Sequence, residues 1–175
     1  QANKAVYELL RYGVKVREEI GEQKETIWLI DWKNQEKNDF AIAEEVTVKG
    51  KHSKRPDLVL YVNGIAVGII ELKSSRVGIE KGIHQNLDNQ QDNFIPHFFT
   101  TMKFVMAGND TSGLKYGTIE TVEKYYLSWK EEDLSPATDE YLIDFQLKQL
   151  MKKERFLEVI NDFTIFDSGT KKLCR

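Results

Sequence analysis

Apolar and polar residues alternate along much of this chain with the period of two that is typical of β-strands. Strands are expected around 14–16 and 27–30, and over 39–49, 58–62, 65–72, 98–107, 115–119 and 163–166. Apolar positions at helical spacing predict helices at 2–12, 80–93 and, as one or two helices, 139–160. Strands and helices in this order predict a mixed α/β fold: an α+β mixed sheet flanked by helices, with a C-terminal helical segment.

The clearest local pattern is a β-hairpin over 58–72. Asn63 and Gly64 separate two apolar runs, and Asn-Gly favours the type I′ turn that joins antiparallel strands. The second run, 65–72, is almost entirely apolar. A strand of that composition is expected in the centre of a sheet, covered on both faces. The strand at 115–119 is expected at an edge.

Three ionisable residues mark the ends of this hairpin: Asp57 before the first strand, and Glu71 and Lys73 at the end of the second. By spacing alone, Glu71 and Lys73 are equally well interpreted as a salt bridge that caps the strand and as a functional site, and Asp57 taken alone would be a solvated residue at the start of a strand. Asp57 lies six residues before Asn63 and Glu71 seven after Gly64, so the two carboxylates are expected nearly opposite each other. Facing carboxylates repel unless a cation lies between them, which favours a metal site. Oxygen ligands favour Mg²⁺, and the Leu72 carbonyl is a further candidate ligand.

Composition and charge limit the alternatives. The chain has 175 residues, enough for one domain with a core, and its net charge of −3 argues against a free-standing electrostatic DNA binder. Its one cysteine excludes an intrachain disulfide framework and favours a cytoplasmic protein. The longest apolar run is too short to cross a membrane. The start without Met and the basic, abrupt end suggest a fragment of a longer polypeptide.

The residues Pro56-Asp57 and Glu71-Leu72-Lys73 resemble the PD-(D/E)xK nuclease signature. Their surroundings resemble the N-terminal endonuclease domain of type I restriction enzyme R subunits, from residue 9 to the end. The segments that carry this second resemblance are 9–13, 55–73, 95–99, 107–110, 114–118, 129–130, 155–166 and 171–172. The resemblance implies a PD-(D/E)xK restriction-endonuclease-like core.

The resemblance also implies the role of each site residue. Asp57 and Glu71 would ligate Mg²⁺, and Lys73 would orient or deprotonate water or stabilise transition-state charge. Gln85 is the best match to the glutamine of a Gln-x-x-x-Tyr motif, although position 89 is Asn. The catalytic set is therefore Asp57, Glu71, Lys73 and Gln85.

Several positions keep two interpretations. Gln90 with Phe94 is a second frame for the glutamine motif, and a solvated, amide-rich helix face is the alternative to both frames. The resemblance also makes Glu8 a candidate for a further acidic residue. Lys51, Lys54 and Arg55 would contact phosphates or form a solvated loop. Tyr125, Tyr126 and Trp129 would stack on bases or pack in the core. The three histidines form no spaced set.

As an expectation, the resemblance makes 1–175 a single nuclease domain of a longer motor and endonuclease subunit. Its reaction would be Mg²⁺-dependent cleavage of double-stranded DNA, with methyltransferase (M) and specificity (S) subunits as partners. ATP would bind only to motor domains outside this chain, since no Gly-x-x-x-x-Gly-Lys-Ser/Thr loop occurs here. The alternatives are another PD-(D/E)xK DNA nuclease, for repair or stand-alone restriction, and a non-catalytic DNA-docking domain.

Overall fold

A computed structural model of the chain describes residues 2–17, 19, 23–130, 134–167 and 170–173. Its centre is a six-stranded mixed sheet with the strand order β3-β4-β5-β6-β7-β8. These strands are β3 (Phe40–Glu44), β4 (Leu58–Val62), β5 (Ile65–Leu72), β6 (Phe104–Asn109), β7 (Gly113–Gly117) and β8 (Leu127–Ser128). With helices on both faces, this sheet confirms the mixed α/β fold class and agrees with a PD-(D/E)xK-like core.

Strand β5 lies in the middle of the sheet, as its apolar composition predicts. It pairs with β4 in the antiparallel direction through the Asn63-Gly64 turn, where both residues have positive φ angles. It pairs with β6 in the parallel direction. The connection between β5 and β6 contains helix α2 (Glu80–Asn89) and the short 3₁₀ helix η2 (Pro96–Thr100). The predicted hairpin is therefore confirmed.

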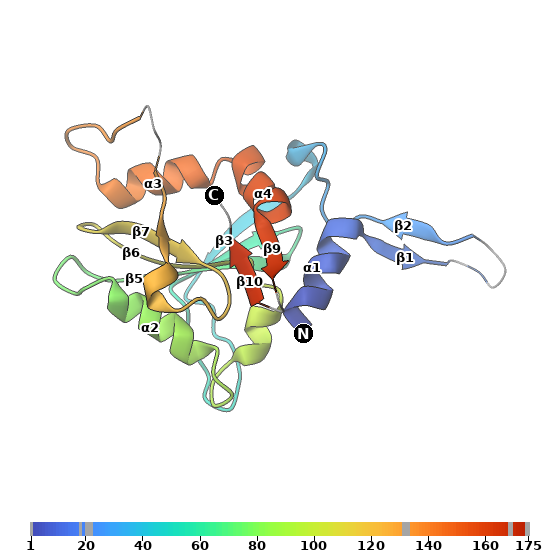
Figure 1. Ribbon diagram of the computed structural model, residues 1–175, viewed down its shortest axis with the longest axis horizontal. Helices are drawn as coiled ribbons and strands as arrows, with labels where there is room; N and C mark the ends of the chain where they lie inside the picture. The colour runs from blue at the N-terminus through green and yellow to red at the C-terminus, as the bar shows by residue number, and fades with distance from the viewer. Residues whose placement is uncertain (1, 18, 20–22, 131–133, 168–169, 174–175) are drawn as a thin grey trace.

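Helices cover both faces of the sheet (Figure 1). Helix α2 lies on one face, and α3 (Leu142–Leu150) and α4 (Lys153–Asp162) lie on the other. Helix α1 (Ala2–Tyr12) has the predicted bounds and contacts η2.

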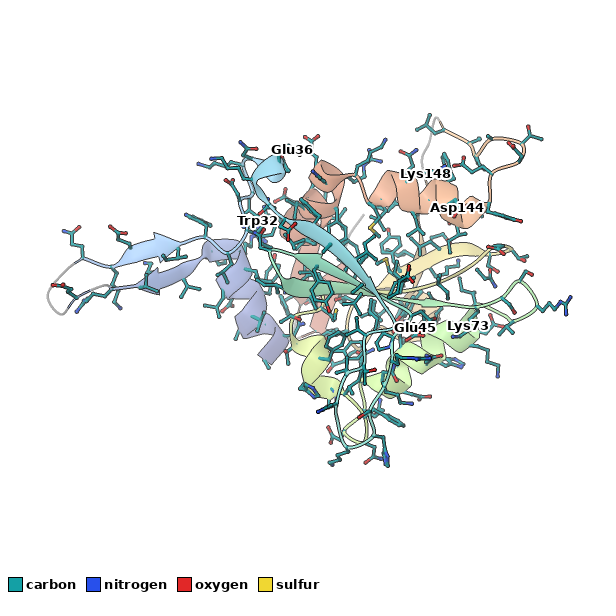
Figure 2. The ribbon with its side chains drawn as sticks, turned by 180° about the vertical axis from the view of Figure 1, so that it is seen from behind. Trp32, Glu36, Glu45, Lys73, Asp144 and Lys148 are labelled. Atoms are coloured by element: carbon teal, nitrogen blue, oxygen red, sulfur yellow. The ribbon has the colours of Figure 1, made fainter. Side chains whose placement is uncertain are left out.

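Two short hairpins and two 3₁₀ helices complete the described chain. The hairpins are β1 (Val14–Val16) with β2 (Glu25–Ile27), which projects from the body in Figure 1, and β9 (Thr164–Asp167) with β10 (Thr170–Leu173). The 3₁₀ helices are η1 (Gln35–Lys37) and η3 (Glu123–Tyr125). Lys153 on α4 donates a hydrogen bond to Glu36 of η1 over 2.7 Å, so η1 is attached at the helix layer, where Figure 2 labels Glu36.

The sheet separates two apolar clusters. The cluster on the α2 side includes Val59, Ile69, Ile83 and Val105. The larger cluster on the other side is built around β6, β7, α3, α4 and α1, with Phe104 stacked on Phe156. Burial of apolar surface on both faces is the main contribution that holds β5 and β6 in the interior.

Two predicted boundaries on the α2 side are wrong. The helix predicted over 80–93 ends at Asn89, because the Asn89 carbonyl accepts a hydrogen bond from Ile95 N and the chain turns back. The strand predicted over 98–107 begins only at Phe104. Pro96 starts the 3₁₀ helix instead, since its ring fixes φ and it donates no N–H to a sheet.

Other boundaries also differ from the prediction. Residues 46–48 contribute only an isolated bridge between Val48 and Lys54, because β3 ends at Glu44 and Glu45 has a positive φ angle. Strand β7 is not at an edge, since β8 pairs with it. The strand predicted to end at Ala107 continues through Gly108 and Asn109.

The C-terminal strand β10 was not predicted, and Cys174 lies outside the described residues. Within the described part of the chain, no helix has both the length and the apolar character needed to span a membrane.

Candidate active site

A single unpaired residue sets the register between Asp57 and Glu71. Next to the turn, Val62 pairs with Ile65 and Tyr61 with Ala66, but beyond the irregularity Leu60 pairs with Gly68 and Leu58 with Ile70. Val67 is therefore left without a partner, as in a β-bulge. With this shift, Asp57 and Glu71 form the next position outward on one face of the hairpin. The bulge accounts for the unequal counts of six and seven residues from the turn.

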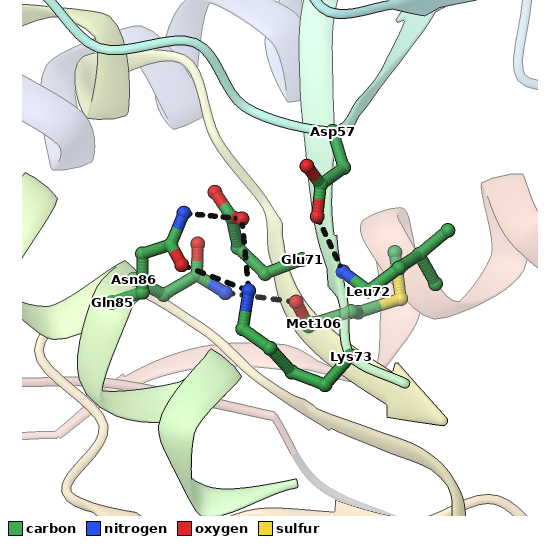
Figure 3. A network of polar contacts seen from close by, with 7 residues as sticks. All are labelled: Asp57, Glu71, Leu72, Lys73, Gln85, Asn86 and Met106. Atoms are coloured by element: carbon green, nitrogen blue, oxygen red, sulfur yellow. Dashed lines mark hydrogen bonds and ion pairs between the residues drawn. The ribbon is translucent and has the colours of Figure 1, made fainter. Parts of the chain in front are cut away.

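The Asp57 side chain is fixed at the end of the strand pair. Its Oδ2 accepts a hydrogen bond from the backbone N–H of Leu72 over 2.7 Å (Figure 3). That N–H lies beyond the last paired residue of β4, so the carboxylate continues the ladder of hydrogen bonds at the end of the strand. Asp57 is partly buried, whereas Glu71 is fully buried, with an exposed fraction of 0%.

The side-chain amide of Gln85 connects Glu71 and Lys73. Its Nε2 donates to Glu71 Oε2 over 2.6 Å, and its Oε1 accepts from Lys73 Nζ over 2.8 Å (Figure 3). Lys73 Nζ lies 3.9 Å from Glu71 Oε2. The amide therefore lies between an acid and an ammonium group and orients both, with donor and acceptor each facing the correct partner.

Helix α2 approaches the sheet closely enough to deliver Gln85. A Cβ atom at Gly82 would lie 3.0 Å from the Ala107 side chain and 3.3 Å from the Glu71 carbonyl. Asn86, next to Gln85, donates from Nδ2 to the carbonyl of Met106 on β6 over 2.8 Å. A glycine at the contact and a buried side-chain hydrogen bond to the strand fix the helix, and with it Gln85.

Burial, together with the negative charge of nearby Asp57, raises the pKa of Glu71 to about 8. The positive charges of Lys73 and Lys54 lower this pKa but do not offset the burial. In the metal-free protein, Glu71 thus holds a proton at neutral pH. The carboxyl group would ionise when a cation comes close to it.

The polar atoms present fit a hard cation. Glu71 Oε1 is buried and has no hydrogen-bond partner among the described residues, whereas Oε2 accepts from Gln85. A buried oxygen without a partner is costly unless a cation or water meets it. No group of three or more His, Cys, Asp or Glu side chains that could hold a metal occurs in the described ranges. A cation here would thus have two carboxylates, with waters or backbone oxygens completing its shell, as suits Mg²⁺.

The other candidates for the glutamine motif lie elsewhere. Gln90 donates to the Asn86 carbonyl and accepts from Glu120 N, so its amide faces away from the carboxylates. Asn89, at the tyrosine position of the motif, is buried in the α2 interface. Glu8 forms a surface pair with Lys4 on α1. The structure brings Gln85, and not Gln90, to Glu71 and Lys73.

Of the aromatic residues considered for base stacking, Tyr126 and Trp129 are buried, in agreement with core packing, and Tyr125 is exposed.

The contact between the Lys54 ammonium and the Phe94 ring was not predicted from the sequence. The Lys54 Nζ lies 4.0 Å from the centre of the Phe94 ring. The residues are 40 positions apart, so only the two-frame ambiguity at Gln90 and Phe94 drew attention to that ring.

The sequence of this chain is similar to those of known proteins. The family described as Type I restriction enzyme R protein N terminus matches residues 1–124. A putative type I restriction enzyme MjaIXP endonuclease subunit from Methanocaldococcus jannaschii is 29% identical over 94% of this chain and 18% of its own length. The type I restriction enzyme HindI endonuclease subunit from Haemophilus influenzae is 26% identical over 94% of this chain and 16% of its own length.

The MjaVIIIP endonuclease subunit from the same archaeon, also named as putative, is 30% identical over 83% of this chain. The chain spans less than a fifth of the length of these relatives. Since the family match covers most of the chain and includes Asp57, Glu71, Lys73 and Gln85, this protein belongs to the family of type I restriction enzyme R protein N termini.

Proposed function

We propose that this chain is the nuclease domain of a type I restriction enzyme R subunit and that it cleaves double-stranded DNA with Mg²⁺. The observation that carries the proposal is the constellation of Asp57, Glu71, Lys73 and Gln85 at one end of the central hairpin, with Glu71 Oε1 buried and lacking a partner among the described residues. Such a site matches the needs of phosphodiester hydrolysis, which are a cation, a positioned water and a positive charge near the phosphate.

Asp57 and Glu71 would hold the cation between their carboxylates. A bound Mg²⁺ supplies Lewis-acid chemistry, which polarises the phosphate and makes a bound water more acidic. Glu71 would give up its proton to solvent when the cation binds. The hydrogen bond from Leu72 N fixes one oxygen of Asp57, which limits how the carboxylate rotates.

Lys73 would orient the attacking water and stabilise the negative charge that develops on the phosphate. Its side chain is 19% exposed and so remains accessible to a substrate. Gln85 would keep the Lys73 ammonium in place through its Oε1 and would keep Glu71 in place through its Nε2. In this arrangement, Gln85 acts by positioning the two charged groups.

The remainder of the enzyme is also part of the proposal. Residues 1–175 would form one nuclease domain of a longer subunit, since the matched relatives are more than five times longer. ATP would serve the motor domains of that subunit. Methylation and recognition of the DNA sequence would belong to M and S partner subunits, in the cytoplasm.

The test uses the full R subunit assembled with its partners. Asp57→Asn, Glu71→Gln and Lys73→Met are each expected to abolish DNA cleavage and to leave ATP-driven translocation close to wild type. The matched control is Glu45→Gln, which removes an exposed carboxylate that pairs with Arg55 near the same strand end. Full cleavage by the Asp57 or Glu71 variant would contradict the proposal. Cleavage lost equally in the Glu45 variant would point to a general charge effect.

A further inference from the structure

The loop before Asp57 is basic, and Lys54 differs from the other cations of the loop because its side chain is partly buried. The loop contains Lys49, Lys51, Lys54 and Arg55. Arg55 forms an exposed pair with Glu45, and Lys49 and Lys51 are exposed. Lys54 is partly buried.

The backbone of Lys54 is fixed by a two-way bridge to Val48. Lys54 N donates to the Val48 carbonyl over 3.0 Å, and Val48 N donates to the Lys54 carbonyl over 2.8 Å. Val48 is itself buried in the apolar cluster on the α2 side. The loop is thus closed at its base, and Lys54 leaves it at a defined point three residues before Asp57.

The side chain of Lys54 lies over the aromatic ring of Phe94. Its ammonium is 4.0 Å from the centre of the Phe94 ring, a favourable cation–π distance. His52 N donates to the Asn93 carbonyl over 3.0 Å, which fastens the loop to the segment that carries Phe94. A Cβ at Gly50 would lie 2.1 Å from the Phe94 carbonyl, so only glycine permits this approach.

Lys54 also lies close to the acidic site. Burial is the main influence on the pKa of Glu71, but the positive charge of Lys54 lowers it, as does that of Lys73. Lys73 comes from the end of β5 and Lys54 from the loop before β4. Two cations from different segments therefore act on the same carboxylate.

We propose that Lys54, oriented by the ring of Phe94, is a phosphate-binding residue of this site and contacts the DNA backbone next to the bond that is cut. The inference rests on the proposed function. The site is acidic and the whole chain is negatively charged, so a substrate polyanion needs local cations to approach it. A lysine held on an aromatic ring gives up less conformational freedom on binding than a fully exposed lysine does.

The test measures binding of the chain to a double-stranded oligonucleotide by fluorescence anisotropy at several KCl concentrations. Glu71→Gln serves as the background, so that no cleavage occurs. Lys54→Met is expected to weaken binding about tenfold and to reduce the slope of log K against log salt by about one. Lys54→Arg is expected to retain most of the affinity. Lys51→Met, the matched control from the same loop, is expected to change affinity less than threefold, about 0.6 kcal/mol or less.

Phe94→Leu keeps an apolar side chain but removes the ring, and about threefold weaker binding is expected. If the ring acts through Lys54, Phe94→Leu adds no further loss to Lys54→Met. An unchanged salt slope, equal effects at Lys51 and Lys54, additive losses at Lys54 and Phe94, or no measurable DNA binding would each overturn the inference. If the variants behave as expected but the assembled wild-type enzyme does not cut DNA, the proposed nuclease function fails while the phosphate contact stands.

Discussion

Asp57 stands opposite Glu71 because Val67 is unpaired in strand β5. A hairpin of uniform register through the Asn63-Gly64 turn would place Ile70 opposite Asp57. The extra residue moves the pairing by one position, which brings both carboxylates to the face that is covered by α2. Burial is the main cause of the raised pKa of Glu71, and the charge of Asp57, which this shift places opposite, adds to it.

Replacing Glu71 is expected to stabilise the metal-free protein at alkaline pH. The pKa of Glu71 is about 8 in the folded protein against 4.5 ordinarily, so the folded state keeps a proton that the unfolded state loses. Stability from this group is complete below pH 4.5 and is lost as pH rises through 8. Relative to wild type, the free energy of unfolding of Glu71→Gln should increase by on the order of 1 kcal/mol per pH unit between the two pKa values. Urea unfolding in the presence of EDTA measures the free energy of unfolding of both proteins. A difference between them that does not change with pH would contradict the raised pKa of Glu71.

Binding of Mg²⁺ is expected to depend on pH because it competes with the proton on Glu71. A fixed Mg²⁺ concentration should raise the melting temperature more at pH 9 than at pH 6.5, since the carboxylate is already ionised at the higher pH. Calorimetry at pH 7 in two buffers of different ionisation enthalpy should detect proton release. Asp57→Asn and Glu71→Gln should each lose the Mg²⁺-dependent shift. A shift of equal size at both pH values would mean that Glu71 is not a ligand.

Gln85 and Gln90 offer a matched pair on one helix. Gln85→Met removes both the donor to Glu71 and the acceptor for Lys73, and cleavage is expected to fall about 10- to 100-fold. Gln90→Met removes hydrogen bonds to the Asn86 carbonyl and Glu120 N, away from the carboxylates, and should leave the cleavage rate unchanged. Single-turnover cleavage by the assembled enzyme distinguishes them. The reverse order of effects would favour the second frame of the motif.

Lys103 is expected to limit stability near neutral pH. It is fully buried, its Nζ has no hydrogen-bond partner among the described residues, and the ring of Tyr7 lies 4.9 Å away. Burial lowers its pKa from 10.5 to about 7, so the unfolded state binds a proton that the folded state lacks between these values. Stability should thus rise as pH increases from 7 to 10.5, by about 1 kcal/mol per unit.

Lys103→Met should be more stable than wild type at pH 7, and the rise with pH should become smaller in this variant. Neighbouring Lys171 is also buried with a lowered pKa, so part of the rise should remain. Urea denaturation from pH 6.5 to 10 tests both points. A less stable variant at pH 7 would show that the Lys103 ammonium is satisfied in the folded state.

The sequence alone determined the hairpin, the central strand and the acidic end of the site. Alternation with a period of two and the Asn63-Gly64 turn are local signals, because they depend on side-chain direction and backbone preference within a few residues. The apolar run of β5 predicted burial on both faces. Asp57, Glu71 and Lys73 could be found because they flank that hairpin.

Only the tertiary structure decided how Gln85 contacts Glu71 and Lys73, and where the helix and strand around Pro96 begin and end. The sequence favoured Gln85 over Gln90 by its position in the motif, and the docking of α2 through Gly82 and Asn86 brings Gln85 to the carboxylate of Glu71. The position of the bulge at Val67 and the contact of Lys54 with Phe94 likewise depend on packing between distant segments. Such contacts are set by the whole core and leave no local periodic signal.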